Sequence, residues 1–330
     1  MGLKMVARLR IILTQHYFCG GLYALLLVVH LINWDSTDAL MIALVTGVSS
    51  SPGYKIAVKL LGRYQVVGTY NEHRVDIPGA ELVRVDLTRG SADLIRNYKP
   101  DVLVHVAAIG NVDQCEEQPD LCYKVNVVAS RELMTNAYRV GSAIYYLSTD
   151  YVFDGERGLY EEGDAPRPVN YYGLTKLLAE EVARALGGAV IRVAWIYGTG
   201  PGRPNFGKTV VDKLRRGEEV RAIIDQWSSP TLNTLIGEAF MKLIEMRFVG
   251  TLHVVGPRMS RYEFAKAIAR YFGFNEDLVK PIRLADVNYR ARRPRDSSLS
   301  NKRAIELLGI PLNDINHALS IFKKELAETA

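Results

Sequence analysis

Residues 41–61 read MIALVTGVSSSPGYKIAVKLL. The run from Met41 to Val45 is short and apolar, which is typical of a buried strand, and residues 54–61 space their apolar side chains as a helix does. Strand, glycine-rich turn and helix is the order that a dinucleotide-binding fingerprint requires, because the backbone N–H groups of the turn and the helix N-terminus attract a pyrophosphate. We therefore expect the turn residues to bind a dinucleotide cofactor. They are Gly47, Ser50 and Gly53.

The alternation of strand and helix continues along the chain. Residues 65–70, 82–85 and 102–106 are strand-like, and helical spacing occurs near residues 92–98 and 121–140. This order predicts an α/β fold with a Rossmann-type, doubly wound parallel sheet.

Ligands bind such a sheet outside the carboxyl ends of its strands. Asp86, at one of these ends, suits the amino group of an adenine, and the small side chains of Ala107 and Ala108 let a dinucleotide cross the sheet edge. The residues at the predicted strand ends are Asn71, Asp86, Leu87, Ala107, Ala108, Ile109, Thr149 and Asp150.

A hydroxyl, a phenol and an ammonium group follow in the second half of this pattern. The apolar run at residues 143–147 predicts a strand that ends at Thr149, and a helix is expected to begin near Tyr171. Tyr172 and Lys176 lie four positions apart on that helix and share one face. The trio suits carbonyl reduction: Thr149 holds the substrate oxygen, Tyr172 donates its proton, and the charge of Lys176 lowers the pKa of the phenol.

The end of the second predicted strand bears on the choice of cofactor. A site for NAD usually has a carboxylate there, which binds the ribose 2′-hydroxyl. Here the strand ends at Asn71, and Arg74 follows closely, where its charge could neutralise the 2′-phosphate of NADP. We expect NADPH, with Asn71 and Arg74 beside it, and Glu72 keeps NADH open as the alternative.

The ordered set of motifs resembles the dTDP-4-dehydrorhamnose reductase family, in the extended short-chain dehydrogenase/reductase superfamily, over residues 41 to about 319. The superfamily fingerprint has three glycines, and Ser50 replaces the middle one; if that position requires a positive φ, a serine is strained there. The matching stretches are STDYVFDG (148–155), NYYGLTK (170–176), AWIYG (194–198), NF (205–206), DQ (225–226), SPT (229–231), and RRP (292–294) with Ser297.

This resemblance implies NAD(P)H-dependent reduction of a 4-keto-6-deoxy sugar nucleotide, most simply of dTDP-4-dehydrorhamnose to dTDP-rhamnose. Thr149, Tyr172 and Lys176 are then catalytic, and the last two also hold the cofactor, which Ser51, Pro52 and residues 107–109 line. The residues expected at the substrate are Thr149, Asp150, Trp195, Arg292 and Arg293. Some bacterial members bind Mg²⁺ through an acidic residue just after the last fingerprint glycine. Lys55 stands at that position, so no metal is expected.

Other interpretations stay open. Trp195 could be a core aromatic residue, and the basic run at residues 290–295 could be a solvated loop rather than a diphosphate site. The pattern is shared with NAD-dependent sugar-nucleotide epimerases and dehydratases, and with the non-catalytic, NADP-binding β subunit of methionine adenosyltransferase. An epimerase would return its NAD unchanged, whereas a regulatory subunit would bind NADP without turnover.

The amino-acid composition limits the ligand class and the compartment only slightly. The net charge of +5, from 41 basic and 36 acidic residues, fits binding of an anionic sugar nucleotide. It is too small to indicate nucleic-acid binding. The three cysteines, Cys19, Cys115 and Cys122, make no disulfide framework, and no cysteine and histidine cluster has metal-ligand spacing. A reducing cytoplasm is the expected compartment, and a homodimer is a possible assembly.

The length from Met41 suits one cofactor domain and a smaller substrate lobe. We expect an NAD(P)-binding domain at residues 41–197 and a substrate lobe mainly at 198–330, with residues near 238–255 returning to the sheet. Residues 1–40 form an N-terminal extension whose apolar stretch could span a bilayer. The alternatives are an upstream translation error, a membrane anchor and an extra packed helix; a membrane partner is expected only for the anchor.

Overall fold

The computed structural model describes residues 40–328. The extension expected at residues 1–40 lies outside the described residues, apart from Leu40. Within the described range, no helix has both the length and the apolar character that crossing a bilayer requires.

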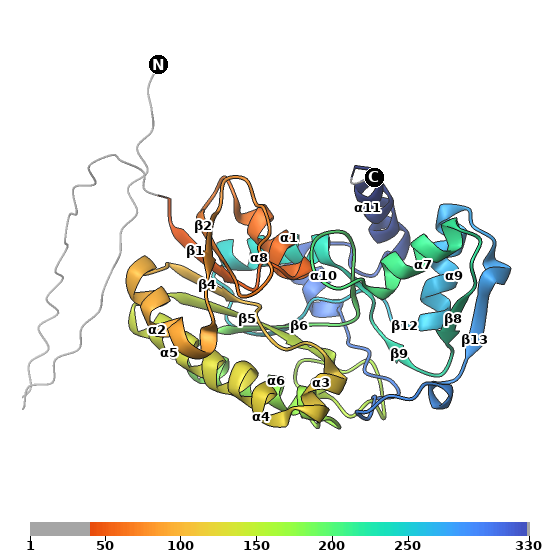
Figure 1. Ribbon diagram of the computed structural model, residues 1–330, viewed down its shortest axis with the longest axis horizontal. Helices are drawn as coiled ribbons and strands as arrows, with labels where there is room; N and C mark the ends of the chain where they lie inside the picture. Colours follow the sequence, from red (N-terminus) through yellow and green to blue (C-terminus); the bar gives the residue numbers. More distant parts are fainter. Residues whose placement is uncertain (1–39, 329–330) are drawn as a thin grey trace, which may run out of the picture. The chain divides into compact units, whose positions relative to one another are not determined.

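A parallel sheet of seven strands forms the centre of the described structure, and it confirms the predicted fold class (Figure 1). The strand order is β11-β6-β5-β4-β1-β2-β3, so the chain winds outward from β1 in one direction and from β4 in the other. The carboxyl ends of β1 and β4 therefore flank the switch point at which such sheets bind ligands. The strands are β1 (Ile42–Thr46), β2 (Gln65–Tyr70), β3 (Glu81–Arg84), β4 (Val102–His105), β5 (Ala143–Thr149), β6 (Ala189–Val193) and β11 (Gly250–His253).

Both faces of the sheet are buried, because successive strand side chains point to opposite sides. In β1, Ala43 and Val45 join the core under α1 and α8, whereas Leu44 joins the core under α2, α5 and α6. Figure 1 shows these two helix layers on opposite sides of the sheet. The helices are α1 (Ser51–Leu60), α8 (Asn233–Glu245), α2 (Leu87–Tyr98), α5 (Ser130–Arg139) and α6 (Tyr171–Ala185).

Two short helices and a π-helical turn precede α5, and they correct an expectation from the sequence. Cys115 lies in α3 (Val112–Glu117) and Cys122 in α4 (Pro119–Tyr123), and the two form a disulfide with an S–S distance of 2.00 Å and a Cα–Cα distance of 5.2 Å. The cysteine pattern predicted no disulfide framework, and this single disulfide was not predicted. The chain turns sharply between α3 and α4, and this turn brings both buried sulfur atoms together.

The remaining elements follow β6 in the chain. Short strands pair as β7 with β10, β8 with β13, and β9 with β12. Helices α7 and α9 pack against each other beside β8. These elements are β7 (Ile196–Tyr197), α7 (Phe206–Arg215), β8 (Val220–Ile223), β9 (Trp227–Ser228), β10 (Thr231–Leu232), β12 (Met259–Ser260), α9 (Arg261–Phe272), β13 (Val279–Ile282), α10 (Lys302–Leu308) and α11 (Ile315–Glu328).

Candidate active site

The glycine turn after β1 is shaped for close approach of backbone. Gly47 has a φ of 72°, and a Cβ placed there would lie 2.8 Å from Cα of Ala107, at the end of β4. At Gly53, a Cβ would lie 2.3 Å from the carbonyl oxygen of Gly47. Both positions therefore exclude side chains and keep the N-terminus of α1 open to a phosphate group.

Ser50, which replaces the middle glycine, is not strained. Its φ of −93° is that of extended backbone, and it caps α1. Its hydroxyl donates to the carbonyl oxygen of Gly47 at 2.7 Å and accepts from the N–H of Gly53 at 3.3 Å. Ser51 and Pro52 then form the first turn of α1. A serine thus serves here because the position needs a cap rather than a positive φ.

The adjacent end of β4 is held against β1 by Thr46. Its hydroxyl accepts hydrogen bonds from the N–H groups of Val106 and Ala107, at 3.0 and 3.1 Å. The same oxygen lies 2.8 Å from Nδ1 of His105. These contacts fix the predicted cofactor segment that continues through Ala108 to Ile109.

Asn126 connects this segment to the helix that carries the candidate proton donor. It is fully buried, and its amide accepts from the N–H of Ile109 at 2.8 Å and donates to the carbonyl oxygen of Ile109 at 3.1 Å. Asn126 also donates to Oγ1 of Thr175 at 3.1 Å, and Thr175 donates to the carbonyl oxygen of Tyr172 at 2.8 Å. A single amide therefore aligns the cofactor segment and α6.

Helix α6 begins where the sequence predicted. Asn170 caps it by accepting from the N–H of Gly173 at 2.8 Å, and it also donates to the carbonyl oxygen of Arg292 at 3.0 Å. Tyr172 and Lys176 follow one helical turn apart, next to the carboxyl end of β5.

Lys176 is 3% exposed and lies against β5. Its Nζ donates to the carbonyl oxygen of Leu147 at 2.8 Å and lies 4.1 Å from the centre of the Tyr146 ring. Burial lowers the pKa of Lys176 to about 7, and the charge of Glu180 acts in the opposite direction. The ammonium group is thus held in place by a backbone carbonyl of β5.

The pKa of Tyr172 moves in the direction opposite to the one expected. Burial of the phenol group raises its pKa, a hydrogen bond with Thr149 opposes this, and the charge of Asp150 adds to the increase. The charge of Lys176 is not among these causes, so the expected lowering by Lys176 is wrong for this arrangement. Thr149 and Tyr172 do lie close to each other, as the sequence predicted.

Asp150 is 2% exposed and joins three parts of the chain. Its Oδ1 accepts from Thr149 at 3.0 Å, and its Oδ2 accepts from Ser228 in β9 at 2.8 Å and from Ser297 at 2.5 Å. Burial raises the pKa of Asp150 to about 6, although these hydrogen bonds lower it. The carboxyl group predicted to contact substrate therefore also fastens the end of β5 to two distant segments.

A positive charge that was not predicted from the sequence lies next to the end of β2. Arg84, in the neighbouring β3, donates from Nε to the carbonyl oxygen of Asn71 at 3.0 Å. Asn71, Glu72 and Arg74 are all exposed beyond the strand. Arg84 thus lies beside the strand end at which the ribose 2′ group was predicted, and Arg74 follows in the loop after it.

Asp86 has a local structural role beside its predicted contact with adenine. It caps α2, and its Oδ1 accepts from the N–H and the hydroxyl of Thr88 at 2.9 and 2.8 Å. These hydrogen bonds lower the pKa of the carboxyl group. Leu87 follows as the first residue of α2.

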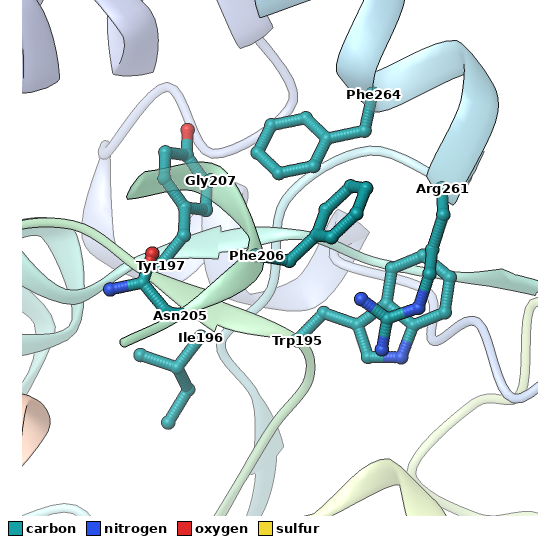
Figure 2. Close-up of a pocket in the computed structure, with 8 residues that line it drawn as sticks. All are labelled: Trp195, Ile196, Tyr197, Asn205, Phe206, Gly207, Arg261 and Phe264. Carbon is teal, nitrogen blue, oxygen red and sulfur yellow. The ribbon is translucent and has the colours of Figure 1, made fainter. Parts of the chain in front are cut away.

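Trp195 follows β6 and lines a pocket of about 120 Å³, together with Phe206 at the start of α7 and Arg261 at the start of α9 (Figure 2). Its φ of 33° is rare for a residue with a side chain. Backbone strain of this kind is found most often at functional sites. Its position at a pocket favours the predicted binding role over that of a core aromatic residue.

The two arginines predicted at the diphosphate differ in their surroundings. Arg293 is paired with Asp113 in α3, with 2.9 Å between Nη2 and Oδ2, and its side chain is 9% exposed. Arg292 is exposed, and its backbone carbonyl is bound by Asn170. The charge of Arg293 is therefore already compensated within the protein.

Lys55, which stands where some relatives were expected to have an acidic residue, forms an ion pair of 2.9 Å with Glu325 in α11. In the part of the chain that the structure describes, no group of three His, Cys, Asp or Glu side chains could hold a metal ion.

Sequence reasoning missed four residues of this site: Arg84, Asn126, Ser228 and Arg261. Arg84 alternates with the half-buried apolar residues Val83 and Val85 at the end of a strand, and this alternation was a usable signal. The other three meet their partners only through contacts between distant segments, for which the sequence pattern holds no local signal.

The chain matches one protein family and resembles several known proteins. Residues 41–328 match the family described as the RmlD substrate binding domain. The methionine adenosyltransferase 2 subunit beta of Rattus norvegicus is 34% identical over 273 residues, which cover 77% of this chain and 81% of that protein.

Two solved structures are similar as well. A hypothetical dTDP-4-dehydrorhamnose reductase from Sulfolobus tokodaii has a TM-score of 0.76 and 34% identity, covering 84% of this chain and 99% of that one. The dTDP-4-dehydrorhamnose reductase of Bacillus anthracis, solved in complex with NADP, has a TM-score of 0.76 and 28% identity, covering 87% and 99% of the two chains. With a matching family model over nearly all of the described residues, the chain belongs to the RmlD substrate binding domain family.

Proposed function

We propose that this protein reduces the 4-keto group of a 6-deoxy sugar nucleotide with NADPH, and that the substrate is dTDP-4-dehydrorhamnose. The observation that carries the proposal is the meeting of Thr149, Tyr172 and Lys176 at the end of β5. Carbonyl reduction requires a group that orients the carbonyl oxygen and one that donates a proton to it.

The cofactor fits the structure through the turn after β1. Gly47 and Gly53 leave a space that a Cβ would fill, and the N-terminus of α1 supplies N–H donors for a pyrophosphate. Arg84 binds the backbone of Asn71 and Arg74 follows in the same loop, so the two would supply positive charge for a 2′-phosphate, and the segment of Ala107 packs against the turn. Bound there, NADPH supplies the hydride for C4 of the sugar.

The protein's own groups handle the oxygen and the proton. Thr149 orients the carbonyl oxygen, and the Tyr172 phenol donates a proton to that oxygen as charge develops on it. Lys176 holds the ribose next to the nicotinamide and keeps a positive charge beneath the reacting oxygen. Its lowered pKa of about 7 means that its charge changes near neutral pH.

The similarity to the methionine adenosyltransferase β subunit favours a second candidate, a regulatory subunit that binds NADP without turnover. The intact catalytic trio argues for the reductase. The near-ultraviolet absorbance of NADPH, followed with purified protein and dTDP-4-dehydrorhamnose, separates the two.

A reductase consumes NADPH in proportion to the sugar that is reduced. Tight NADPH binding without consumption would replace the reductase by the regulatory subunit. Conversion of the sugar nucleotide with no net change in cofactor would identify an epimerase and would also contradict the proposal.

A further inference from the structure

The pocket beside Trp195 contains a cation that no described carboxylate neutralises. The Cζ atom of Arg261 lies 4.3 Å from the centre of the Trp195 ring and 4.9 Å from the centre of the Phe206 ring. Figure 2 shows the guanidinium group over the indole ring at the edge of the pocket. Among residues 40–328, no carboxylate forms an ion pair with Arg261.

Two donors at this pocket also lack acceptors. The Nε atom of Arg261 and the Nε1 atom of Trp195 are both buried, and neither has a hydrogen-bond partner among the described residues. A buried donor left without an acceptor is rare in folded proteins and destabilises them. The pocket therefore lacks an acceptor that carries negative charge, and a phosphate group has both properties.

The volume of the pocket limits what it can hold. Its volume of about 120 Å³ is below the roughly 300–1,000 Å³ of pockets that enclose a whole small-molecule ligand. It therefore receives one part of a larger molecule. The rest of that molecule must extend beyond the pocket.

Tyr151 relates the pocket to the candidate catalytic centre. The ring of Tyr151 meets that of Tyr172 edge-on, with 6.1 Å between their centres. Burial raises the pKa of Tyr151 to about 12, and the nearby charges of Arg293 and Arg261 oppose this increase. Tyr151 thus contacts Tyr172 and is within electrostatic range of Arg261, so the pocket and the candidate catalytic centre belong to one region of the protein.

We propose that Arg261, with the indole N–H of Trp195, binds the diphosphate of the sugar nucleotide. This inference rests on the proposed function for its ligand class. Arg261 takes this role rather than Arg293, because the charge of Arg293 is already paired with Asp113. Arg261 is then a binding residue that fixes the distance between the diphosphate and the reacting end of the sugar.

The test measures binding rather than turnover, so it is independent of the substrate assignment. Isothermal titration of the full chain with dTDP, UDP and ADP gives their affinities, and thymidine serves as the probe without phosphate. Arg261→Gln should weaken nucleoside diphosphate binding by about ten- to a hundredfold, the effect of losing a charge-assisted hydrogen bond. Arg261→Lys, which keeps the charge, should retain part of the affinity.

Arg270→Gln is the matched control, because Arg270 lies on the same helix but pairs with Glu276 at its exposed end. That variant should bind dTDP as the parent does. The binding of NADPH should be equal in all variants, which also shows that each one is folded.

Two results would overturn the inference while leaving the proposed reductase standing: dTDP binding that is unchanged in Arg261→Gln, or an equal loss of thymidine and dTDP binding. A parent protein that binds none of the three diphosphates would overturn the inference as well. A loss of diphosphate affinity in Arg261→Gln supports it even if dTDP-4-dehydrorhamnose is not turned over.

Discussion

The hydroxyl group of Thr149 donates its proton to Oδ1 of Asp150, over a distance of 3.0 Å. A hydroxyl has one proton, so in this arrangement Thr149 does not donate to a substrate carbonyl. Thr149 can turn to the substrate when Asp150 releases it. The proton on Asp150 and the availability of Thr149 are therefore coupled.

Tyr172→Phe should lower kcat by about 10²-fold or more, because it removes the phenol proposed to protonate the reduced oxygen. The affinity for NADPH should stay close to that of the parent, since the cofactor turn is untouched. Steady-state kinetics and a fluorescence titration with NADPH check both points. Tyr171→Phe, one position earlier on α6, is the control and should keep full activity. Near-normal turnover in Tyr172→Phe would remove this residue from the catalytic assignment.

Asp150→Asn should change how stability depends on pH. The folded pKa of Asp150, about 6, exceeds the ordinary value of 3.8, so between these values the unfolded chain releases a proton that the folded protein retains. The contribution of this group to the free energy of unfolding is therefore complete below pH 3.8 and is lost as the pH rises to about 6. The loss amounts to roughly 3 kcal/mol.

Urea unfolding of the parent and of Asp150→Asn at several pH values measures this effect as a difference. The buried histidines His105 and His253, whose pKa values burial lowers to about 3, act in the opposite direction. They are present in both proteins and cancel in the difference. A difference that does not vary between pH 4 and 7 would contradict the raised pKa of Asp150.

Arg74→Ala should reduce the preference for NADPH over NADH. One charge-assisted hydrogen bond to the 2′-phosphate contributes about 1–2 kcal/mol, which corresponds to a ten- to thirtyfold preference. Titration of both cofactors should show that most of this preference disappears while NADH affinity remains. Arg84→Ala is the companion variant, and Arg96→Ala, with a paired and exposed side chain on α2, is the control. Equal affinity for both cofactors in the parent would point to Glu72 as the neighbour of the ribose instead.

Asn126→Ala should lower the free energy of unfolding by about 2–4 kcal/mol, because it leaves the N–H and the carbonyl of Ile109 without partners. NADPH affinity should fall as well, since the segment at Ile109 loses its anchor. Chemical denaturation and cofactor titration measure the two effects. Asn136→Ala, on α5, should change stability by less than about 0.5 kcal/mol. If the variants at 126 and 136 behave alike, the anchoring role of Asn126 is wrong.

The fold could be predicted because its signals are local. The apolar run of β1, the turn from Gly47 to Gly53 and the apolar spacing of α1 lie within about twenty residues and each favours the same structure. The arrangement of Thr149, Tyr172 and Lys176 was predictable for the same reason, since a strand end and a helical spacing of four define it.

The other features of the site depend on contacts between distant segments, which the sequence pattern does not reveal. Arg261 meets Trp195 only because α9 packs beside the segment after β6. The pKa of Tyr172 rises because of burial by other elements, and local spacing carries no information about burial. The number of cysteines likewise did not predict the disulfide between Cys115 and Cys122. This bond arises from the turn between α3 and α4 rather than from a disulfide framework.

The ion pair between Lys55 and Glu325 has a consequence for synthesis on the ribosome. The fingerprint helix α1 is translated well before its partner in α11. Glu325 also accepts a hydrogen bond from Thr199, so α11 secures the segment that leads to α7. A nascent chain can build the central sheet in order, yet α1 lacks this ion pair until α11 has been translated. Release from the ribosome before that point would leave the central sheet assembled but α1 without its partner in α11.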